Sequence, residues 1–369
     1  MSSTQNGTPL DASQLSPAAQ RALGPGPGRG MAARGLVPLP PADQVAVLYQ
    51  LALDTESNVA QAARATAAGL PEKLLAGTLA QPTIDPRVLD FFAQLITDKP
   101  AVFDAIALNP AVADATIATL AGRAGAREVD QIAHNEQRLL RHPEIIAAMY
   151  MNRRARMSTI DRVVELAVRN QVRVPGLAAW DEVARALTGA PASTGDADAV
   201  FAAAAAAAHD DSALTTGDAE QALSEEELAA AAAAHDDEHQ ELTVPMKVRL
   251  ATLGNGVDRG KLIRDPVKMV AMAAIKSPGV TDIEAARYAG NQALAEDVIR
   301  YIANNRNWTK LYGVKVSLCR NPKAPISETT RFLPFLRQKD LVNLSKSKSV
   351  PSAVVAQARK LIMQRGGKG

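Results

Sequence analysis

Apolar residues recur every three or four positions along most of this chain, which is the spacing of one face of an α-helix. Val45, Leu48 and Leu51 show this spacing early in the chain, and Val298 and Ile302 show it near the end. Aromatic residues make up only 4% of the sequence, and alanine is abundant. This composition favours thin helices in close contact over a β-sandwich or barrel. We therefore predict an all-α protein.

Prolines interrupt the helical pattern at two similar joints in the last third of the chain. One helix ends at Lys276-Ser277-Pro278 before another begins at Thr281, and the sequence Arg320-Asn321-Pro322 repeats the arrangement. Proline lacks a backbone N–H and moves the preceding residue out of the helical region, so it ends one helix and can begin the next. We predict that Pro278 and Pro322, 44 residues apart, lie in the first turn of a helix or in the loop just before it.

Three further joints, at Pro82, Pro110 and Pro143, lie in the first half of the chain at intervals of 28 and 33 residues. Helical-repeat solenoids have periods of about 20–50 residues. Because these intervals differ from one another and from 44, the sequence predicts an irregular α-solenoid, a helical-repeat array in two parts. A capping-box-like stretch, Ser158-Thr159-Ile160-Asp161, predicts the start of one of its helices.

Composition divides the chain into four predicted segments. Residues 1–41 contain Gly24-Pro25-Gly26-Pro27-Gly28 and should be a disordered tail, with a proline-motif ligand as the alternative. Residues 42–187 should form an N-terminal helical array. Residues 188–243 are acidic and contain two alanine runs; alanine favours helix but buries little surface, so we expect a partly helical, loosely docked linker. Residues 244–366 should form a basic C-terminal helical-repeat domain.

The formal net charge of +2 hides an uneven distribution. Residues 1–192 balance 18 basic against 18 acidic residues, whereas residues 193–245 hold 13 acidic residues and no Lys or Arg. Residues 246–369 hold 23 basic and 8 acidic residues. An acidic segment directly before a basic domain indicates a role in binding or in its regulation. We expect the linker to compete with polyanions for the basic domain.

The C-terminal third resembles a known family. The phrases that carry the resemblance are Gly254-Asn255-Gly256 with Leu262-Ile263-Arg264-Asp265-Pro266, residues 271–278, residues 302–310, Asn321-Pro322-Lys323 and residues 339–351. Over 244–366 the chain resembles an uncharacterised bacterial helical-repeat family, similar to HEAT-like and leucine-rich-variant α-solenoids. The resemblance implies an α-solenoid in the cytoplasm. It implies no activity and no catalytic residue.

Candidate chemistry is sparse. His235 and His239 have the i, i+4 spacing of a helical zinc site, but Asp236 stands where a metalloprotease has Glu and no third ligand is marked, so we interpret them as a solvated helix end. Gly254-Asn255-Gly256 follows a helix and lacks the further Gly or Lys of a phosphate-binding loop, so it should end that helix. Cys319 lies in an apolar run and should be buried and inert. We expect no enzyme activity, no cofactor and no metal.

Basic residues interleaved with aromatic ones are the main functional signal. Such a pattern suits phosphate contact with base stacking, although basic side chains can also simply solvate a helical array, and Trp308 and Tyr312 can be core residues. The candidate binding residues are Arg306, Trp308, Lys310, Tyr312, Lys315, Arg320, Lys323, Arg337, Lys339, Lys346 and Lys348.

These observations favour a non-enzymatic binding or scaffolding module that holds another protein on its helical-repeat surface. The alternative is an RNA- or DNA-binding protein that uses the basic C-terminal domain and is modulated by the acidic linker. No apolar run approaches the roughly 20 residues that cross a bilayer, so no membrane partner is expected. With a single cysteine and no signal pattern at its start, the chain is expected to be cytoplasmic.

Overall fold

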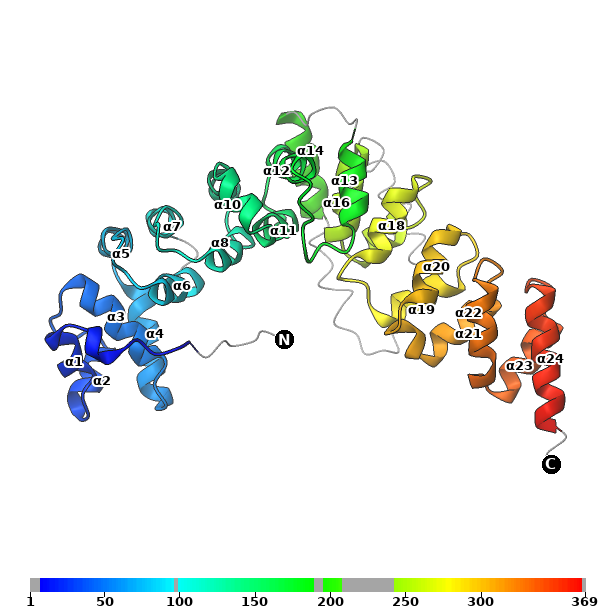
Figure 1. The fold of residues 1–369 in the computed structure, drawn as a ribbon, viewed down its shortest axis with the longest axis horizontal. Helices are drawn as coiled ribbons and strands as arrows, with labels where there is room; N and C mark the ends of the chain where they lie inside the picture. The colour runs from blue at the N-terminus through cyan, green and yellow to red at the C-terminus, as the bar shows by residue number, and fades with distance from the viewer. Residues whose placement is uncertain (1–6, 96–98, 189–194, 208–241, 367–369) are drawn as a thin grey trace. The chain divides into compact units, whose positions relative to one another are not determined.

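The computed structural model describes residues 7–95, 99–188, 195–207 and 242–366, and all regular structure in these ranges is helical (Figure 1). The prediction of an all-α protein is confirmed. The chain divides into unit 1, Met1–Pro175, and unit 2, Gly176–Gly369. Within the described ranges, no helix has the length and apolar character needed to cross a membrane.

Unit 1 is an array in which each helix packs against helices close to it in the sequence. Its main contacts join α3 to α4, α5 to α7, and α8 to α11. The helices are η1 (Ala12–Gln14), α1 (Pro17–Leu23), α2 (Pro27–Ala33), α3 (Pro41–Ala52), α4 (Ser57–Gly69), α5 (Glu72–Leu79), α6 (Pro86–Leu95), α7 (Pro100–Ala107), α8 (Asp114–Ala121), α9 (Ala126–Ala133), α10 (Glu136–Arg141), α11 (Glu144–Met151) and α12 (Met157–Arg169).

The prediction of a disordered tail over 1–41 is wrong for residues 7–41, which contain η1, α1 and α2. Helix α1 packs against α3, and α2 packs against α4. Pro17 and Pro27 each lie at the start of a helix, where the missing N–H has no intrahelical partner to lose. The stretch Gly24-Pro25-Gly26-Pro27-Gly28 was expected to be disordered, but Pro27 begins a short helix.

Helix α12 begins at Met157, with Arg156 as its N-cap residue. Ser158 therefore lies inside the first turn, and the predicted capping box does not set the start of this helix. The helix itself is present, and its apolar side chains Ile160, Val163 and Val164 are buried as the periodicity indicates.

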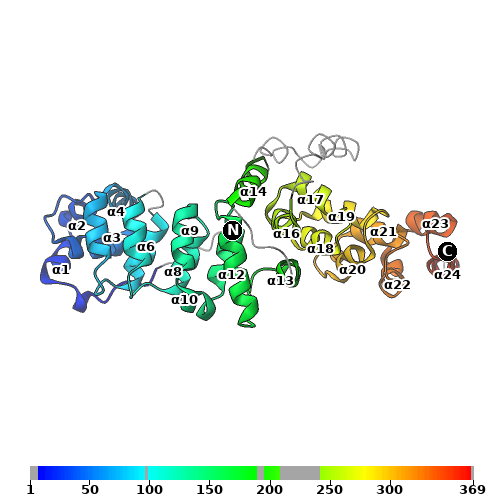
Figure 2. The ribbon, with the colours of Figure 1, turned by 90° about the horizontal axis from the view of Figure 1, so that it is seen from above.

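Unit 2 continues with helices that follow one another in chain order (Figures 1 and 2). They are α13 (Trp180–Leu187), α14 (Gly195–Ala207), α16 (Val244–Leu253), α17 (Gly256–Leu262), α18 (Lys268–Lys276), α19 (Asp282–Gly290), α20 (Glu296–Asn304), η3 (Trp308–Lys310), α21 (Tyr312–Arg320), α22 (Ile326–Phe332), η4 (Leu333–Phe335), α23 (Gln338–Lys346) and α24 (Ser352–Gly366).

Helix α13 belongs to unit 2, although the sequence analysis assigned it to an array ending at residue 187. It packs against α16 and α18. The side chain of Glu182, in α13, accepts two hydrogen bonds from the Lys276 ammonium of α18, at 2.8 and 2.9 Å. Both side chains are largely buried. This pair of opposite charges, far apart in the sequence, helps to hold α13 in unit 2. The spacing of apolar residues along a helix gives no information about such a pair.

The predicted linker, 188–243, is described only in part. Helix α14 covers residues 202–207 of the first alanine run, 202–208, and packs against α16. Phe201 is buried there beneath the Arg249 guanidinium, 4.5 Å from the ring centroid. The predictions for His235, His239 and the second alanine run lie outside the described residues. The acidic linker's proposed competition with polyanions also depends on residues outside those ranges.

Within the described ranges, five connections between helices share one kind of β-turn, in which the carbonyl of the first residue accepts a hydrogen bond from the N–H three residues later, at 3.1–3.2 Å. Asn or Ser at the first position and Pro at the second favour such turns. Pro82, Pro110, Pro278 and Pro322 each occupy the second position. The turns begin at Gln81, Asn109, Asn152, Ser277 and Asn321. The prediction for Pro278 and Pro322 is confirmed, since both lie in the loop just before a helix.

The side chain of the first residue of such a turn also donates hydrogen bonds to backbone carbonyls at the end of an earlier helix. Asn321 is 1% exposed, and its Nδ2 donates to the carbonyls of Ala289 and Asn291 at 2.9 and 3.2 Å, at the end of α19. Its Oδ1 accepts from the Lys323 N–H at 3.0 Å. The buried amide thus satisfies carbonyls that the end of α19 leaves without intrahelical partners.

The same arrangement occurs three more times. Asn109 donates to the carbonyls of Leu79 and Gln81, and Asn152 donates to those of Ala121 and Ala124. Ser277 donates from Oγ to the Thr252 carbonyl at 2.8 Å. Each bridge ties the first helix of a consecutive group to the last: α5 to α7, α8 to α11, α16 to α18, and α19 to α21.

The bridges in unit 1 lie further apart than the prolines of that unit. Asn109 and Asn152 occupy equivalent turns 43 positions apart, close to the 44 that separate Ser277 from Asn321. Pro143 belongs to another kind of connection, as the N-cap residue of α11. The bridged turns therefore recur at nearly the same interval in the two units, while the related turn at Gln81 lies 28 positions before Asn109, so the array is irregular as predicted.

Candidate binding surface

The predicted binding residues lie on η3, α21, α23 and their connecting loops, all in unit 2. Residues 306–339 contain eight Lys or Arg and a single acidic residue, Glu328. Ion pairs engage two of the basic residues: Arg331 pairs with Glu328 at 2.7 Å, and Arg320 pairs with Asp340 at 3.1 Å. This segment therefore carries a strong positive excess.

Four side chains form a cluster that we call the Phe335 patch: Tyr312, Lys315, Phe335 and Arg337. Phe335 is 65% exposed, and the Lys315 ammonium lies over its ring, 5.1 Å from the centroid. The Arg337 guanidinium lies over the Tyr312 ring at 4.8 Å. Cations in this position are attracted to the negative face of an aromatic ring. Lys315 thus contacts the Phe335 ring, and the predicted residues Tyr312 and Arg337 contact one another beside it in the chain.

A hydrogen-bond network fixes the base of this patch. The Tyr312 hydroxyl donates to Asp340 at 2.6 Å and accepts from the Arg337 N–H at 2.9 Å. Arg320 bonds the other oxygen of the same carboxylate. Loss of solvation and the bond to the Asp340 carboxylate raise the pKa of Tyr312 above its usual value. The phenol therefore stays protonated and acts as a fixed link between α21 and the start of α23.

Trp308 was predicted as a binding residue, but the structure places it in the core, 9% exposed. Its ring packs edge to face against Tyr301, with centroids 6.2 Å apart. A ring enclosed in this way has no open face for a nucleobase. The alternative interpretation of Trp308 as a core residue is the correct one.

The other predicted residues are mostly solvent-exposed cations. Lys323 is held at the α21–α22 turn, where Nζ donates to the Leu294 carbonyl at 2.7 Å. Arg306 follows α20, and Lys310 ends η3. The remaining three lie on α23 or just after it: Lys339, Lys346 and Lys348.

Phe335 is not among the predicted binding residues, because it lies in an apolar run, Leu333-Pro334-Phe335-Leu336, whose positions are expected to be buried. Leu333 and Leu336 are indeed buried, and both flank Phe335 in or next to η4. A 3-10 helix has three residues per turn, so positions 333 and 336 face the same side and 335 faces away. A period of three within Leu333-Pro334-Phe335-Leu336 is the signal that could have identified it.

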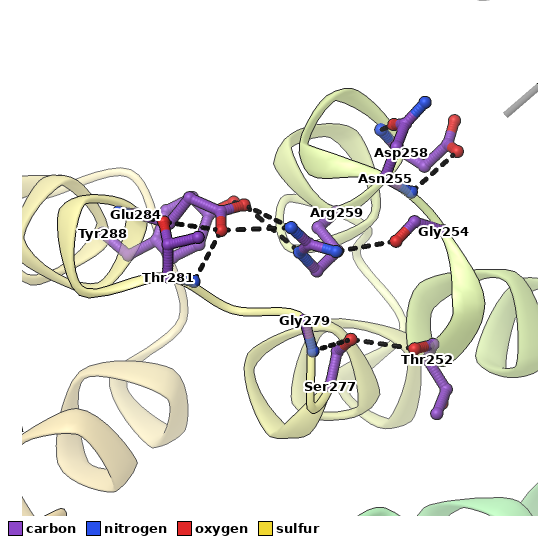
Figure 3. Close-up of polar contacts among 10 residues, drawn as sticks. All are labelled: Thr252, Gly254, Asn255, Asp258, Arg259, Ser277, Gly279, Thr281, Glu284 and Tyr288. Carbon is purple, nitrogen blue, oxygen red and sulfur yellow. Dashed lines mark hydrogen bonds and ion pairs between the residues drawn. The ribbon is translucent and has the colours of Figure 1, made fainter. Parts of the chain in front are cut away.

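A separate buried polar network joins α17 to α19 (Figure 3). The Arg259 guanidinium donates through Nη2 to both oxygens of Glu284, at 3.0 and 3.1 Å, and through Nη1 to the Gly254 carbonyl at 2.7 Å. Glu284 also accepts from the N–H and hydroxyl of Thr281, forming the capping box of α19. Arg259 and Glu284 are 7% and 9% exposed.

The residues of this network are closely packed. A Cβ atom at Gly279 would lie 2.7 Å from Arg259 Nη1, so glycine is needed for the close approach of chain and guanidinium. Burial, and then the charge of Glu284, raise the pKa of Tyr288, whose hydroxyl lies 3.4 Å from that carboxylate. Since its charged groups are occupied by one another, the network fixes α17 and α19 in place.

Gly254 and Asn255 show what the glycine-rich stretch does. Gly254 ends α16 as its C-cap, and Asn255 begins α17 in a capping box with Asp258. The interpretation of Gly254-Asn255-Gly256 as a helix end is confirmed. No phosphate-binding loop is formed by these residues.

Cys319 is 1% exposed, as predicted, on the inner face of α21. Burial raises the pKa of its thiol to about 12, because an apolar environment disfavours the thiolate. Across the ranges that the structure describes, no group of three or more His, Cys, Asp or Glu residues could hold a metal ion.

Comparisons of this chain with models of protein families, with curated proteins and with solved structures found no match. The class that the fold defines is an all-α protein whose helices follow one another as an array. Membership of the helical-repeat family that the sequence resembles stays a prediction.

Proposed function

We propose that this chain is a non-enzymatic binding module that holds another protein on the surface of unit 2. One observation supports this most strongly: the Phe335 patch presents an exposed aromatic ring with the Lys315 ammonium over it and Arg337 two residues further along the chain. Aromatic and Arg side chains are enriched at the centres of protein interfaces, and charged residues around them steer partners. The lone buried Cys319 fits a reducing compartment, so we also propose that the protein acts in the cytoplasm.

Nucleic-acid binding is the second candidate, supported by the excess of eight basic over one acidic residue in 306–339. Cations alone supply a non-specific affinity for phosphates. Two facts weigh against it: Trp308 is buried, and Arg337 lies over the Tyr312 ring. Few open rings are left for base stacking.

A pull-down from native cell extract tests the proposal. The bait is the full chain, compared with Lys315→Glu/Arg337→Glu, a charge reversal at the Phe335 patch. We expect the wild type to retain proteins that the reversal loses, and nuclease treatment to leave them bound. Retention that nuclease abolishes would favour the second candidate, and equal retention by both baits would contradict a binding role for this patch.

A salt series on the retained material separates the two candidates further. Binding through phosphates falls steeply and linearly in log affinity against log salt, because counterions are released. Binding that depends on burial of Phe335 should fall much less between low and physiological salt.

A further inference from the structure

Phe335 is the one exposed aromatic ring among the described residues, and the fold holds its backbone in position. Arg365 of α24 donates to the carbonyls on either side of it, reaching Pro334 at 2.5 Å and Leu336 at 2.7 Å. Leu333 and Leu336 are buried on the side that faces away from the ring, and their packing holds the backbone in place. An anchor that is already ordered loses less conformational entropy when it is covered by a partner.

Three cations, which we call the collar, lie over the ring or close to it along the chain: Lys315, Arg337 and Lys339. Lys315 lies over the ring, Arg337 is two residues further along the chain, and Lys339 is exposed at the start of α23. Asp340 is the nearest acidic residue in the sequence, and it is occupied by Tyr312 and Arg320. The collar therefore complements a negatively charged partner, whereas its apolar centre requires a partner with an apolar side chain.

We propose that the Phe335 patch binds an acidic peptide segment that places one large apolar side chain on Phe335 and its carboxylates on Lys315 and Arg337. This inference rests on the proposed function and names the chemistry of its partner. A peptide fits better than a nucleic acid because the patch offers one exposed ring, whereas single-stranded nucleic acid stacks successive bases on several aromatic rings. Carboxylates can pair with the Lys315 ammonium and the Arg337 guanidinium, while one apolar side chain needs only the exposed part of the ring.

Fluorescence anisotropy on the full chain tests this directly. Three labelled probes are compared at physiological salt: a short Asp/Glu-rich peptide with one central Leu, the same peptide with Ser in place of Leu, and a single-stranded oligothymidylate. We expect the Leu peptide to bind at least about tenfold more tightly than the Ser peptide, since one well-buried anchor side chain typically contributes that much.

Matched variants locate the binding. Phe335→Ser should weaken the Leu peptide about tenfold and bring it close to the Ser peptide. Ile283→Ser removes another exposed apolar side chain, 50% exposed in α19, and should leave the affinity unchanged. Lys315→Gln should weaken both peptides, whereas Arg264→Gln, at an exposed cation after α17, should weaken neither.

Arg365→Gln tests the role of Arg365 as a positioning residue. We expect Arg365→Gln to bind the Leu peptide more weakly than the wild type. Adding Lys315→Gln to that variant should weaken binding by the same factor as Lys315→Gln does in the wild type, because Arg365→Gln leaves the collar unchanged. A circular-dichroism melt confirms that each variant is folded before its affinity is compared.

Three results would overturn the inference. Equal affinity of Phe335→Ser and wild type for the Leu peptide would show that the ring is not the anchor. Equal affinity for the Leu and Ser peptides would show that charge alone acts. Binding of the oligothymidylate in place of both peptides would reject a peptide partner while leaving unit 2 as a binding module for nucleic acid. The pull-down judges the proposed function separately, because its bait reports any retained macromolecule.

Discussion

At the scale of single residues, two buried side chains, Arg259 and Cys319, are stabilised in different ways. Arg259 is enclosed with Glu284 and the Gly254 carbonyl, so its charge depends on partners that cannot be replaced by water. Cys319 has no charge to compensate and lies beside the Thr329 carbonyl, 3.7 Å from Sγ. The first group is held by specific partners and the second by packing.

Replacing Arg259 by Ala should lower the free energy of unfolding by about 3–5 kcal/mol, because it leaves the Glu284 carboxylate buried without its cation. The control is Arg300→Ala, which breaks an exposed pair with Glu296 in α20 and should cost less than about 1 kcal/mol. Urea unfolding of both variants provides the measurement. Similar losses for the two would show that the Arg259 network is not energetically special.

Cys319 should react slowly with a bulky maleimide in the native protein and rapidly in urea. With its pKa raised to about 12, the native thiol remains protonated at any pH where the reagent is stable, so raising the pH from 7 to 9 should accelerate only the unfolded chain. An unfolded thiol has a pKa near 8.5, so its ionisation above that pH favours unfolding. Equal native and unfolded rates would contradict the buried position.

At the scale of elements, the sequence predicted the helices well where apolar periodicity and proline agreed. Pro278 and Pro322 lie just before helices, as expected, because proline's restriction of the chain is local. The bridging role of Asn109, Asn152 and Asn321 could not be predicted, since it depends on a carbonyl about 30 positions earlier that only the packed array brings close. Local rules also failed at Pro27, where proline begins a helix.

Asn321→Ala should destabilise unit 2 by about 1–3 kcal/mol, because the buried carbonyls of Ala289 and Asn291 lose their donor. Asn321→Ser should cost less, since Ser277 fills the equivalent position with one hydroxyl bond. Asn307→Ala, at an exposed turn residue, serves as the control and should change little. Chemical denaturation followed by circular dichroism measures all three, and a serine variant as unstable as the alanine one would argue against the equivalence.

The proposed binding residues could be named as a basic group from the sequence, but their arrangement on the surface could not. Charge and composition identify a basic segment, and two of the residues predicted from it, Lys315 and Arg337, lie in the Phe335 patch. Whether a side chain is exposed depends on the tertiary structure, so the sequence could not show that Trp308 is buried and Phe335 is exposed. Both are large aromatic residues, and only their neighbours in the fold distinguish them. The 3-10 turn at Leu333–Phe335 decides which ring faces solvent.

At the scale of the whole molecule, the boundary between the two structural units does not coincide with the boundaries between the acidic and basic segments. Acidic and basic character change near residues 193 and 246, whereas the units meet between Pro175 and Gly176. Helix α13 lies before the acidic segment in sequence and packs with helices after it. The buried pair of Glu182 and Lys276 is part of the reason, because neither charge is stable there alone.

A fragment covering 176–369 should therefore be more stable than one covering 188–369, which lacks α13 and leaves Lys276 without Glu182. Thermal melts of the two fragments test this, and the lower Tm should belong to the shorter one. Glu182→Ala in the longer fragment should reproduce part of the difference. Identical melting curves would show that α13 contributes nothing to unit 2.

The central claim is that unit 2 binds a protein partner through Phe335. Photo-cross-linking tests it most directly: a benzophenone amino acid replaces Phe335 in one preparation and Ile283 in another, and both are irradiated in native extract. We predict cross-linked products at position 335 that are absent at 283, sensitive to protease and unaffected by nuclease. Products of equal yield at both positions, or none at 335, would contradict the claim.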